Sequence, residues 1–530
     1  MYQVDSEDAN FLFLERTESP THISLICLYD QPAPEEGGLR FTHIRQHIGN
    51  RLNSAPMFQQ KIRFTPGNID YPYWVDDEQF DLDFHVRHLA LPKPGDWRQF
   101  CIQVSRLHSR PLDISRPLWE MYVIEGLDHM AGFPPHCFAL YFKVHHCAMD
   151  EFTAQELLQS LHEQTPNPKQ HESSAQHIAH LPAVAPSPLE MVLRGLVNNS
   201  ARTGRLLVQS ANNLPTLAKI VTRLSIRAAG RAVGADSLSD VPVTRFARPL
   251  TSSRVFEGGF YSRQTLDGYA GLVPGATLTH ALLAICSEAV RLYLERHGEW
   301  EGAPLTALLA VNVRNAGAHA LAGNRLAINQ VELHTLVEYP EGRLQAICAA
   351  QPELHSTESA ELTSFRLRSL YEYLPAPLLA WLGRSANSQN SLNRTVMKAG
   401  NFGLSELRGS KQPRYLIGAR LLGFTGISPL YSGCGLMFSA STYCDTVGLT
   451  FTSGRNMMPD PEEMRACLDE AVGQIERYLD PKPKPKSKPK PKSKPKPKAR
   501  SKPKSQLAPK RGRKGTGPKA RAVGQPGSTL

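Results

Sequence analysis

The sequence lacks the features that define several common protein classes. No apolar run approaches the roughly 18–20 residues that a membrane-spanning helix needs, and the acidic N-terminus has no apolar signal-peptide core. The nine cysteines have no metal or redox spacing, and neither HExxH nor GxSxG occurs. These absences favour a cytoplasmic protein with reduced cysteines, at most peripheral to a membrane. They also disfavour a serine nucleophile on an α/β-hydrolase fold.

The positive charge of the chain is confined to its C-terminal tail. Residues 481–530 hold 18 lysines and arginines and no acid, whereas residues 1–480 hold 42 basic and 49 acidic residues. The net charge of +11 therefore does not identify the whole protein as a nucleic-acid binder. The tail alternates proline and lysine, which predicts an extended, disordered segment. Such a segment binds DNA, RNA, polyphosphate or anionic lipid non-specifically, or it only solubilises the chain.

Composition divides the remaining chain into three parts. Residues 1–165 and 245–480 carry the periodic apolar segments of α/β units, and residues 166–244 begin as a linker rich in proline, serine and histidine. Within that linker, Leu189–Val233 shows helical apolar spacing, seven basic residues and one acid, and Pro215 interrupts it. A basic amphipathic helix can lie in a membrane interface, or it can pack on the protein as a crossover helix.

The most informative segment is His145–Asp150, which reads HHCAMD. The alternating apolar run Cys137–Val144 before it predicts a strand, and the spacing of Phe152–Leu161 after it predicts a helix with Thr153 as the N-cap. A strand that delivers two histidines and a carboxylate to a loop is typical of a catalytic turn, because imidazole accepts a proton near neutral pH. An inert, hydrogen-bonded histidine pair is the alternative. A metal site is disfavoured because adjacent histidines diverge.

Three segments stand out in the second unit. Leu278–Leu294 predicts a helix that ends near His297–Gly298, and Leu305–Val313 predicts a buried strand. The proline-interrupted segment Leu374–Gly383 contains Trp381 and is assigned to the core, with a lipid-facing lip as the alternative.

Longer motifs surround the histidine pair in a fixed order. Arg110–Gly126, with the sequence Pro-Leu-Trp-Glu, lies about thirty residues upstream, and the N-terminal region carries Asp8–Leu12 and Pro20–His22. The second half adds three more matches, which are Gly323–Arg325, Tyr415–Leu421 and Ser428–Leu430. HHxxxD alone is a modest signal, but this co-linear set from about residue 5 to 478 is specific. It closely resembles the bacterial wax ester synthase/diacylglycerol acyltransferases.

This resemblance implies an α/β fold of two chloramphenicol-acetyltransferase-like, acyl-CoA-dependent acyltransferase domains that face each other across a tunnel, here followed by the disordered tail. The domains would be residues 1–165 and 245–480, joined by the linker and crossover helix of 166–244. The implied activity moves a fatty acyl group from acyl-CoA to diacylglycerol, giving triacylglycerol, or to a long-chain alcohol, giving a wax ester. Acyl-CoA is then a substrate, and neither a cofactor nor a metal is expected. The inner membrane or lipid inclusions are the expected sites of any peripheral attachment.

The resemblance also assigns roles within the motif. His146, its second histidine, is the expected general base, and His145 is expected to support the loop and the tunnel wall. Asp150 is expected to act structurally, by holding the loop. Trp119 is expected to line the acyl tunnel or to be core, and Asn324 to donate a hydrogen bond from the second domain.

Three departures from the family pattern concern the surroundings of this base. The family's Asp-Gly is Asp150-Glu151 here, its Asn-Asp is Thr279-His280, and its Ser-Asn-Val-Pro-Gly-Pro loop is replaced by Phe402–Pro413. They keep other hypotheses open. One is a condensation-type acyltransferase with another acceptor, and one is a retired enzyme that coats lipid droplets or granules and binds polyanions through the tail. A third is a nucleophilic Cys147.

Overall fold

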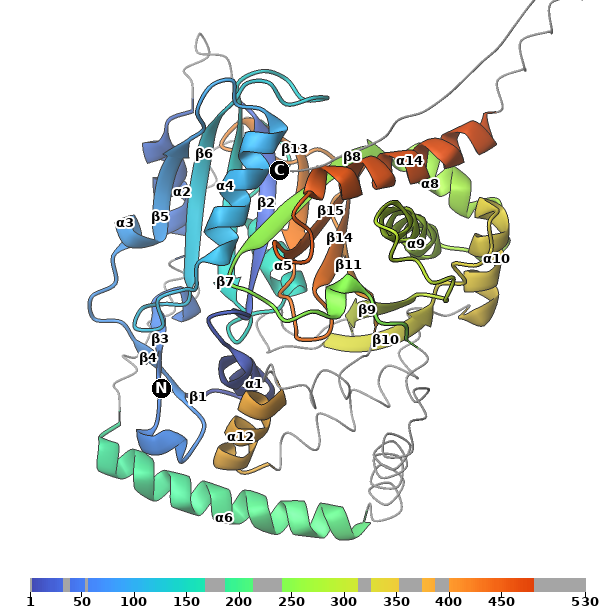
Figure 1. Ribbon diagram of the computed structural model, residues 1–530. Coiled ribbons are helices and arrows are strands. Elements are labelled where there is room, and N and C mark those ends of the chain that lie inside the picture. Colours follow the sequence, from blue (N-terminus) through green and yellow to red (C-terminus); the bar gives the residue numbers. More distant parts are fainter. Residues whose placement is uncertain are drawn as a thin grey trace, which may run out of the picture. The chain divides into compact units, whose positions relative to one another are not determined.

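The computed structural model of the protein describes residues 2–31, 39–52, 56–166, 186–212, 241–312, 326–351, 374–386 and 400–480. A first sheet has the strand order β12 (Tyr415–Leu416), β13 (Ala419–Ile427), β2 (His22–Asp30), β7 (Cys137–His145), β6 (Trp119–Leu127) and β5 (Val86–Ala90), as seen in Figure 1. A second sheet has the order β10 (Leu326–Glu332), β9 (Thr306–Asn312), β11 (Phe402–Arg408), β14 (Leu436–Tyr443), β15 (Thr446–Gly454) and β8 (Arg254–Ser262). A small sheet has the order β1 (Tyr2–Gln3), β4 (Tyr73–Asp76) and β3 (Gln60–Arg63).

Helices pack around these sheets, which confirms the predicted α/β class. They are α1 (Ser6–Leu14), α2 (Phe41–Leu52), α3 (Leu82–His85), α4 (Trp97–Ser109), α5 (Glu151–Ser160), α6 (Pro188–Asn212), α8 (Arg263–Ala270), α9 (Leu278–Arg296), α10 (Pro340–Ala350), α12 (Ala376–Ala386) and α14 (Pro461–Leu479), with short 3-10 turns η2 (Pro56–Phe58), η3 (Pro66–Asn68) and η4 (Arg245–Ala247). Among the helices of the described residues, none combines the length and the apolar character needed to cross a membrane.

The first sheet is covered on both faces. Phe142 and Val144 of β7 pack into one core cluster with α2 and α5, whereas Ala139 and Tyr141 pack into another with α4. Because neither face is open to water, nearly every position of the strand must be apolar, which explains the continuous apolar run. The strand predicted from Cys137 to Val144 is confirmed and ends at His145.

Strand β13 belongs to the C-terminal half of the chain but joins the first sheet. It pairs antiparallel with β2, from Arg420 opposite Asp30 to Ile427 opposite Ser24. The hydroxyl of Thr425 on β13 also lies 2.6 Å from that of Thr450 on β15, so this strand contacts both sheets. Strands from both predicted domains therefore share one sheet.

The second sheet packs against α8, α9, α10 and α14 in a single large core cluster. The predicted helix is confirmed as α9, which ends at Arg296 and is followed by Gly298 at φ +65°, a conformation that favours glycine. The predicted strand Leu305–Val313 is confirmed as β9. These segments were predicted correctly because the spacing of their apolar residues fits only one type of secondary structure.

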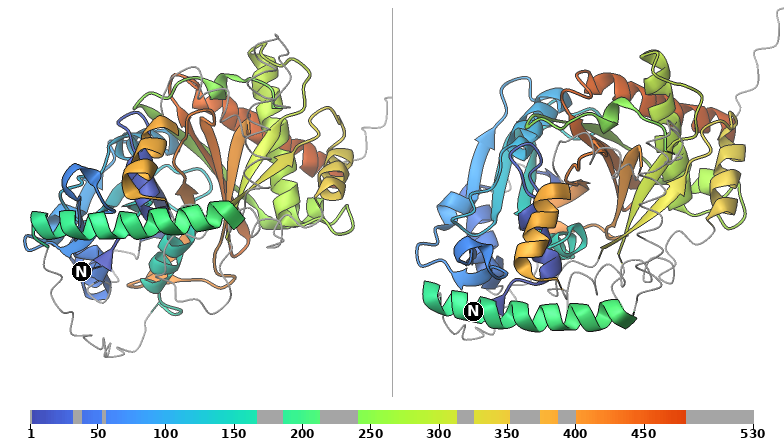
Figure 2. Two further views of the ribbon diagram at one scale, coloured as in Figure 1. Left: turned by 90° about the horizontal axis from the view of Figure 1, so that it is seen from below. Right: turned by 60° about the horizontal axis from the view of Figure 1, so that its bottom comes forward.

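Helices α1, α12 and α6 lie together beyond the end of β7. α12 packs against α1, and the backbone amide of Ala376 on α12 donates to Oδ1 of Asn199 on α6 at 3.1 Å. Figure 2 shows α6 lying across this side of the molecule with α12 beside it. The helical spacing predicted at the start of Leu189–Val233 is confirmed by α6, and the residues from 213 to 233 lie outside the described part of the chain.

Candidate active site

The HHxxxD motif forms a tight turn between β7 and α5. The amide of His145 donates to the carbonyl of Leu118 at 3.0 Å, and the amide of His146 donates to the carbonyl of Thr21 at 2.9 Å. The amide of Ala148 closes the turn on the carbonyl of His145 at 2.9 Å. The backbone of the turn is therefore fixed by β6, by the start of β2 and by itself.

The side chain of His145 is buried and hydrogen-bonded on both ring nitrogens. Its Nδ1 accepts from the amide of Cys147 at 3.0 Å, so the ring proton belongs on Nε2. Nε2 lies 3.1 Å from Oγ1 of Thr21 and 3.3 Å from a carboxylate oxygen of Glu15. These contacts join the ring to the turn and to the N-terminal segment that carries Glu15 and Thr21.

The imidazole of His146 lies against an aromatic ring from the N-terminal helix. The ring centroids of Phe11 and His146 are 4.0 Å apart with an interplanar angle of 10°, and His146 is only 3% exposed. This stacking restrains the plane of the imidazole through the face of the ring.

Asp150 is fully buried and caps α5. Its Oδ1 accepts from the amide of Thr153 at 2.8 Å and from the hydroxyl of Thr153 at 2.9 Å. The sequence-based assignment of Thr153 as the N-cap is therefore wrong. Asp150 takes that position because its backbone is in the β region and its carboxylate accepts from the amide three residues on. Thr153 instead contributes both donors.

Glu151 follows directly as the first residue of α5 and is 5% exposed. Its carboxyl accepts a hydrogen bond from the hydroxyl of Ser405 on β11. Burial raises the pKa of this carboxyl, the hydroxyls of Ser405 and Ser428 lower it in part, and Asp150 raises it further. The residue that departs from the family pattern thus joins the motif turn to the second sheet.

Trp119 is in the core. Its indole Nε1 donates to the carbonyl of Phe58 at 2.9 Å, and its ring stacks on His85 with centroids 4.5 Å apart. A small cavity of about 20 Å³ is lined by Leu25, Leu158, Arg414 and others, and its lining includes neither Trp119 nor the motif histidines. Asn324, the remaining predicted site residue, lies outside the described residues.

Cys147 is buried among apolar side chains of α1 and α12. Burial raises the pKa of its thiol well above the usual range, and the nearby carboxylates of Asp8 and Glu15 raise it further. A thiol in such surroundings is a poor source of thiolate. The environment therefore disfavours the nucleophilic role considered for Cys147.

The second family departure, Thr279-His280, has a structural explanation at the start of α9. Nδ1 of His280 accepts from the amide of Thr277 at 3.0 Å, and Nε2 lies 3.0 Å from the carbonyl of Gln351. His280 thus satisfies a helix-start amide, as an acidic residue does in a capping box. The hydroxyl of Thr279 donates to the buried carboxylate of Glu406 on β11.

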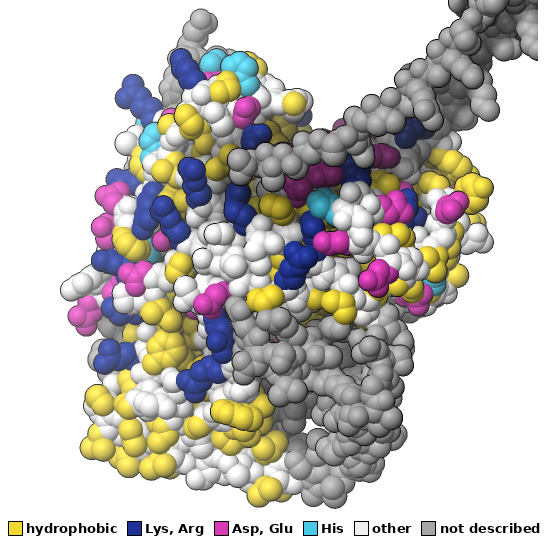
Figure 3. Space-filling model, viewed as in Figure 1, with side chains coloured by type: hydrophobic (Ala, Val, Ile, Leu, Met, Phe, Trp, Pro, Cys, Tyr) yellow, Lys and Arg dark blue, Asp and Glu magenta, His cyan; other side chains and the backbone are white. Residues whose placement is uncertain are grey.

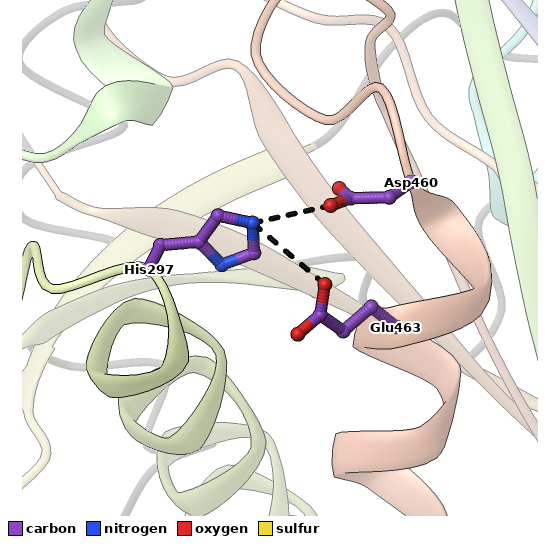
Figure 4. Close-up of side chains that lie close together, drawn as sticks. All are labelled: His297, Asp460 and Glu463. Atoms are coloured by element: carbon purple, nitrogen blue, oxygen red, sulfur yellow. Dashed lines mark hydrogen bonds and ion pairs between the residues drawn. The ribbon is translucent and has the colours of Figure 1, made fainter.

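A cluster of potential metal ligands lies elsewhere, where α9 ends and α14 begins (Figure 4). Nε2 of His297 is 3.1 Å from Oδ2 of Asp460 and 3.8 Å from Oε2 of Glu463. Burial alone would raise the pKa of Asp460, but hydrogen bonds from Tyr293 and His297 outweigh it and lower the pKa. All three side chains are partly exposed, and their mutual contacts are those of an ion pair that joins two helices.

Sequence reasoning missed three residues that contact the histidine pair, namely Phe11, Glu15 and Thr21. Phe11 and Thr21 lie inside the N-terminal segments Asp8–Leu12 and Pro20–His22, which were noted only as family matches. Their order in the sequence was a signal, but their contact with residues more than 120 positions away was not visible in it.

The chain matches known proteins along most of its length. Residues 4–262 match the model of the wax ester synthase/diacylglycerol acyltransferase catalytic domain, and residues 322–476 match the model of the C-terminal domain of the same family. The O-acyltransferase WSD of Acinetobacter baylyi is 26% identical over 488 residues, which cover 89% of this chain and 96% of that protein. A Mycobacterium tuberculosis protein named among the diacylglycerol O-acyltransferases is 27% identical over 494 residues, which cover 91% and 99%.

The fold is also that of a solved structure. The wax ester synthase/diacylglycerol acyltransferase from Marinobacter aquaeolei VT8 superimposes with a TM-score of 0.60 at 23% sequence identity. The superposition covers 90% of this chain and 100% of that one. This similarity confirms the predicted two-domain α/β fold of the family.

Proposed function

The chain belongs to the wax ester synthase/diacylglycerol acyltransferase family and is an acyltransferase, and we propose that it moves a fatty acyl group from acyl-CoA to diacylglycerol or to a long-chain alcohol, with His146 as the general base. The observation that carries the proposal is how the motif turn holds its second histidine. The backbone amide of His146 donates to the carbonyl of Thr21, its ring stacks on Phe11, and His145 beside it bonds to the turn through Nδ1.

The chemistry requires a single proton carrier. As the alcohol oxygen bonds to the thioester carbonyl carbon, the imidazole of His146 takes the hydroxyl proton. When the carbon–sulfur bond breaks, the same ring returns that proton to the departing CoA sulfur. A thiolate leaves readily, so no acyl-enzyme is needed. General base catalysis contributes about 10²–10⁴-fold, which corresponds to roughly 3–5.5 kcal/mol of barrier.

Asp150 and Glu15 support this base indirectly, through the turn that carries it. Asp150 starts α5 and thereby fixes the C-terminal end of the turn, and Glu15 faces the Nε2 proton of His145. Neither carboxylate is assigned a proton transfer. Their role in the proposal is to keep the turn rigid, because small displacements of a catalytic group are costly to the rate.

The acceptor is identified by measuring CoA release from palmitoyl-CoA in the presence of hexadecanol or diacylglycerol. Faster acceptor-dependent release with one of them names the acceptor class. Cys147→Ala serves as the matched variant for the thiol route, because a general-base mechanism survives it and a cysteine nucleophile does not. Loss of acceptor-dependent release in Cys147→Ala would contradict the mechanism proposed here.

We propose further that the enzyme works on a lipid surface, which it contacts through α6 and α12. The outward face of α6 is apolar towards both ends of the helix, where its large side chains are more than half exposed: Leu189, Leu193, Leu196, Val197, Leu207 and Val208. On neighbouring α12, Trp381 is 61% exposed. The core assignment of Leu374–Gly383 is therefore wrong for Trp381, although Leu379 and Ala380 of the same helix are buried.

The opposite face of α6 is attached by polar contacts. Asn198 and Arg202 bond to the buried carboxylate of Asp70, and Asn199 bonds to the carbonyl of Ile69. An amphipathic helix normally buries its apolar face, so this orientation is unusual for a helix that contacts only protein. Figure 3 shows hydrophobic side chains along the edge of the molecule where Figure 1 places α6.

Arginine side chains beside this face suit an anionic lipid surface. Arg205 is exposed, and Arg194 is exposed but pairs with Glu190 of the same helix. Both arginines lie on one flank of the apolar face, as helical spacing of 100° per residue dictates. Apolar side chains enter the acyl layer in such an arrangement while the guanidinium groups pair with phosphates. Trp381 suits the same interface because its ring is amphipathic.

Flotation with phosphatidylglycerol-containing vesicles tests the surface. The variants Leu193→Asp and Trp381→Ser should each lower the bound fraction by about tenfold or more, because each loses a buried apolar side chain. Leu336→Asp and Tyr339→Ser are matched controls at exposed apolar positions elsewhere and should bind as wild type does. Equal binding of all variants would contradict a membrane-contact role for α6 and α12. The tail, with its 18 basic residues, would then be the remaining candidate for lipid binding and would be tested by deletion.

A further inference from the structure

The carboxyl of Glu151 occupies the junction between the catalytic turn and the C-terminal half of the chain. Glu151 is one residue beyond Asp150, and its carboxyl accepts a hydrogen bond from the hydroxyl of Ser405. Ser405 is in the middle of β11, in the second sheet. We propose that Glu151 is a positioning residue, which fastens the His146 turn to β11. The inference rests on the proposed role of His146.

The local contacts favour positioning over a role in helix stability alone. Asp150 already caps α5, so Glu151 is not required to satisfy the first amides of the helix. Further along the same helix, Nε2 of Gln155 donates to the carbonyl of Arg408 at 2.6 Å. α5 is thus attached to β11 at two points one helical turn apart, and Glu151 is the point nearer to the motif. A rigid attachment there sets the distance between His146 and any group that β11 presents to substrate.

The charge state of the carboxyl decides how well this attachment holds. The titratable groups that act on Glu151 are the carboxylate of Asp150 on its own turn and the phenol of Tyr431 in the segment after β13. Neither supplies a compensating positive charge. Burial and Asp150 raise the pKa of Glu151, so the neutral carboxyl persists to higher pH than an exposed glutamate allows. Ionisation places a negative charge between the two halves of the protein and loosens the junction.

The sign of the pH effect follows directly. The folded-state pKa is raised, so the contribution of this group to stability is fully present below the ordinary glutamate pKa and is lost as the pH rises through the raised value. Ionisation of Glu151 should therefore lower the turnover of wild type as the pH rises. Glu151→Gln cannot ionise and keeps a similar shape, so it should lose less turnover than wild type over the same pH range.

The experiment is the pH profile of acceptor-dependent CoA release for wild type, Glu151→Gln and Ser405→Ala. The hydroxyl of Ser405 lowers the pKa of Glu151, so in Ser405→Ala the loss of turnover relative to Glu151→Gln should begin at higher pH. Glu151→Ala should lower kcat by about 10–100-fold and change KM less, because the substitution displaces the catalytic turn but leaves the substrate contacts in place. Glu156→Gln, at an exposed glutamate of the same helix, is the matched control and should keep the wild-type profile.

Superimposable profiles of wild type and Glu151→Gln would overturn the inference, as would full activity of Glu151→Ala. Thermal unfolding of the same variants across the pH range gives a second readout that needs no substrate. There, wild type should lose stability relative to Glu151→Gln as the pH rises, and equal curves would also count against the junction. Failure of the proposed function looks different, because wild type itself would then show no acceptor-dependent release at any pH.

Discussion

Phe11 and His146 stack face to face, with ring centroids 4.0 Å apart, although 135 positions separate them in the sequence. The ring of Phe11 restrains the imidazole plane, so Phe11→Ala should lower kcat/KM by about tenfold or more through a less ordered base. Steady-state kinetics measure this. Phe84→Ala, which removes a half-buried ring that lies under Arg116, is the control and should retain wild-type activity. Equal kinetics for Phe11→Ala and wild type would show that the stacking is incidental.

The loop-ordering role of His145 predicts a specific pattern of stability. Replacement by leucine leaves the buried amide of Cys147 without its acceptor and should lower the free energy of unfolding by about 1–3 kcal/mol. Asparagine places an oxygen near the position of Nδ1, so His145→Asn should recover part of that loss. Urea unfolding of the two variants checks this. If leucine and asparagine cost the same, the Cys147 contact does not stabilise the turn.

Asp150 acts through the start of α5, so a residue that also caps helices should replace it in part. Asp150→Ala should lower the free energy of unfolding by about 0.5–2 kcal/mol, and Asp150→Ser should restore most of it. Activity should follow stability in this series. A serine variant that is stable but inactive would instead show that the charge of Asp150 matters to the reaction.

Acid should destabilise the protein through His162. Burial lowers the pKa of this histidine from 6.5 to about 4, and its ring lies 2.7 Å from the hydroxyl of Tyr29. The folded state therefore binds the proton more weakly than the unfolded state, and stability should fall by up to about 3 kcal/mol as the pH drops from 6.5 to about 4. The variant His162→Gln does not titrate and should lose less stability over this range in urea titrations. An unchanged slope would assign the acid sensitivity to other groups.

The sequence revealed the parts of the structure that depend on local patterns. β7, β9 and α9 were predicted because the spacing of their apolar residues fits only one type of secondary structure. The N-cap of α5 was misplaced because Asp150 and Thr153 are both good caps, and only the backbone geometry distinguishes them. Trp381 was assigned to the core because composition cannot tell which face of a short apolar helix meets protein.

Long-range contacts account for what the sequence could not show. The pairing of β13 with β2 joins segments almost 400 residues apart and leaves no periodic trace. The same holds for Glu151, whose partner Ser405 is 254 positions away. Glu151 was visible in the sequence as a departure from the family pattern, but its proposed role depends on the hydrogen bond from Ser405 on β11. The histidine pair itself was recognised, since the residue types and the preceding strand together carry that signal.

The most direct test of the catalytic assignment compares His146→Ala with wild type in acceptor-dependent CoA release from palmitoyl-CoA, with circular dichroism to establish that the variant is folded. The base role of His146 predicts a loss of about 10²-fold or more in the folded variant. A folded His146→Ala protein that turns over at the wild-type rate would contradict the assignment.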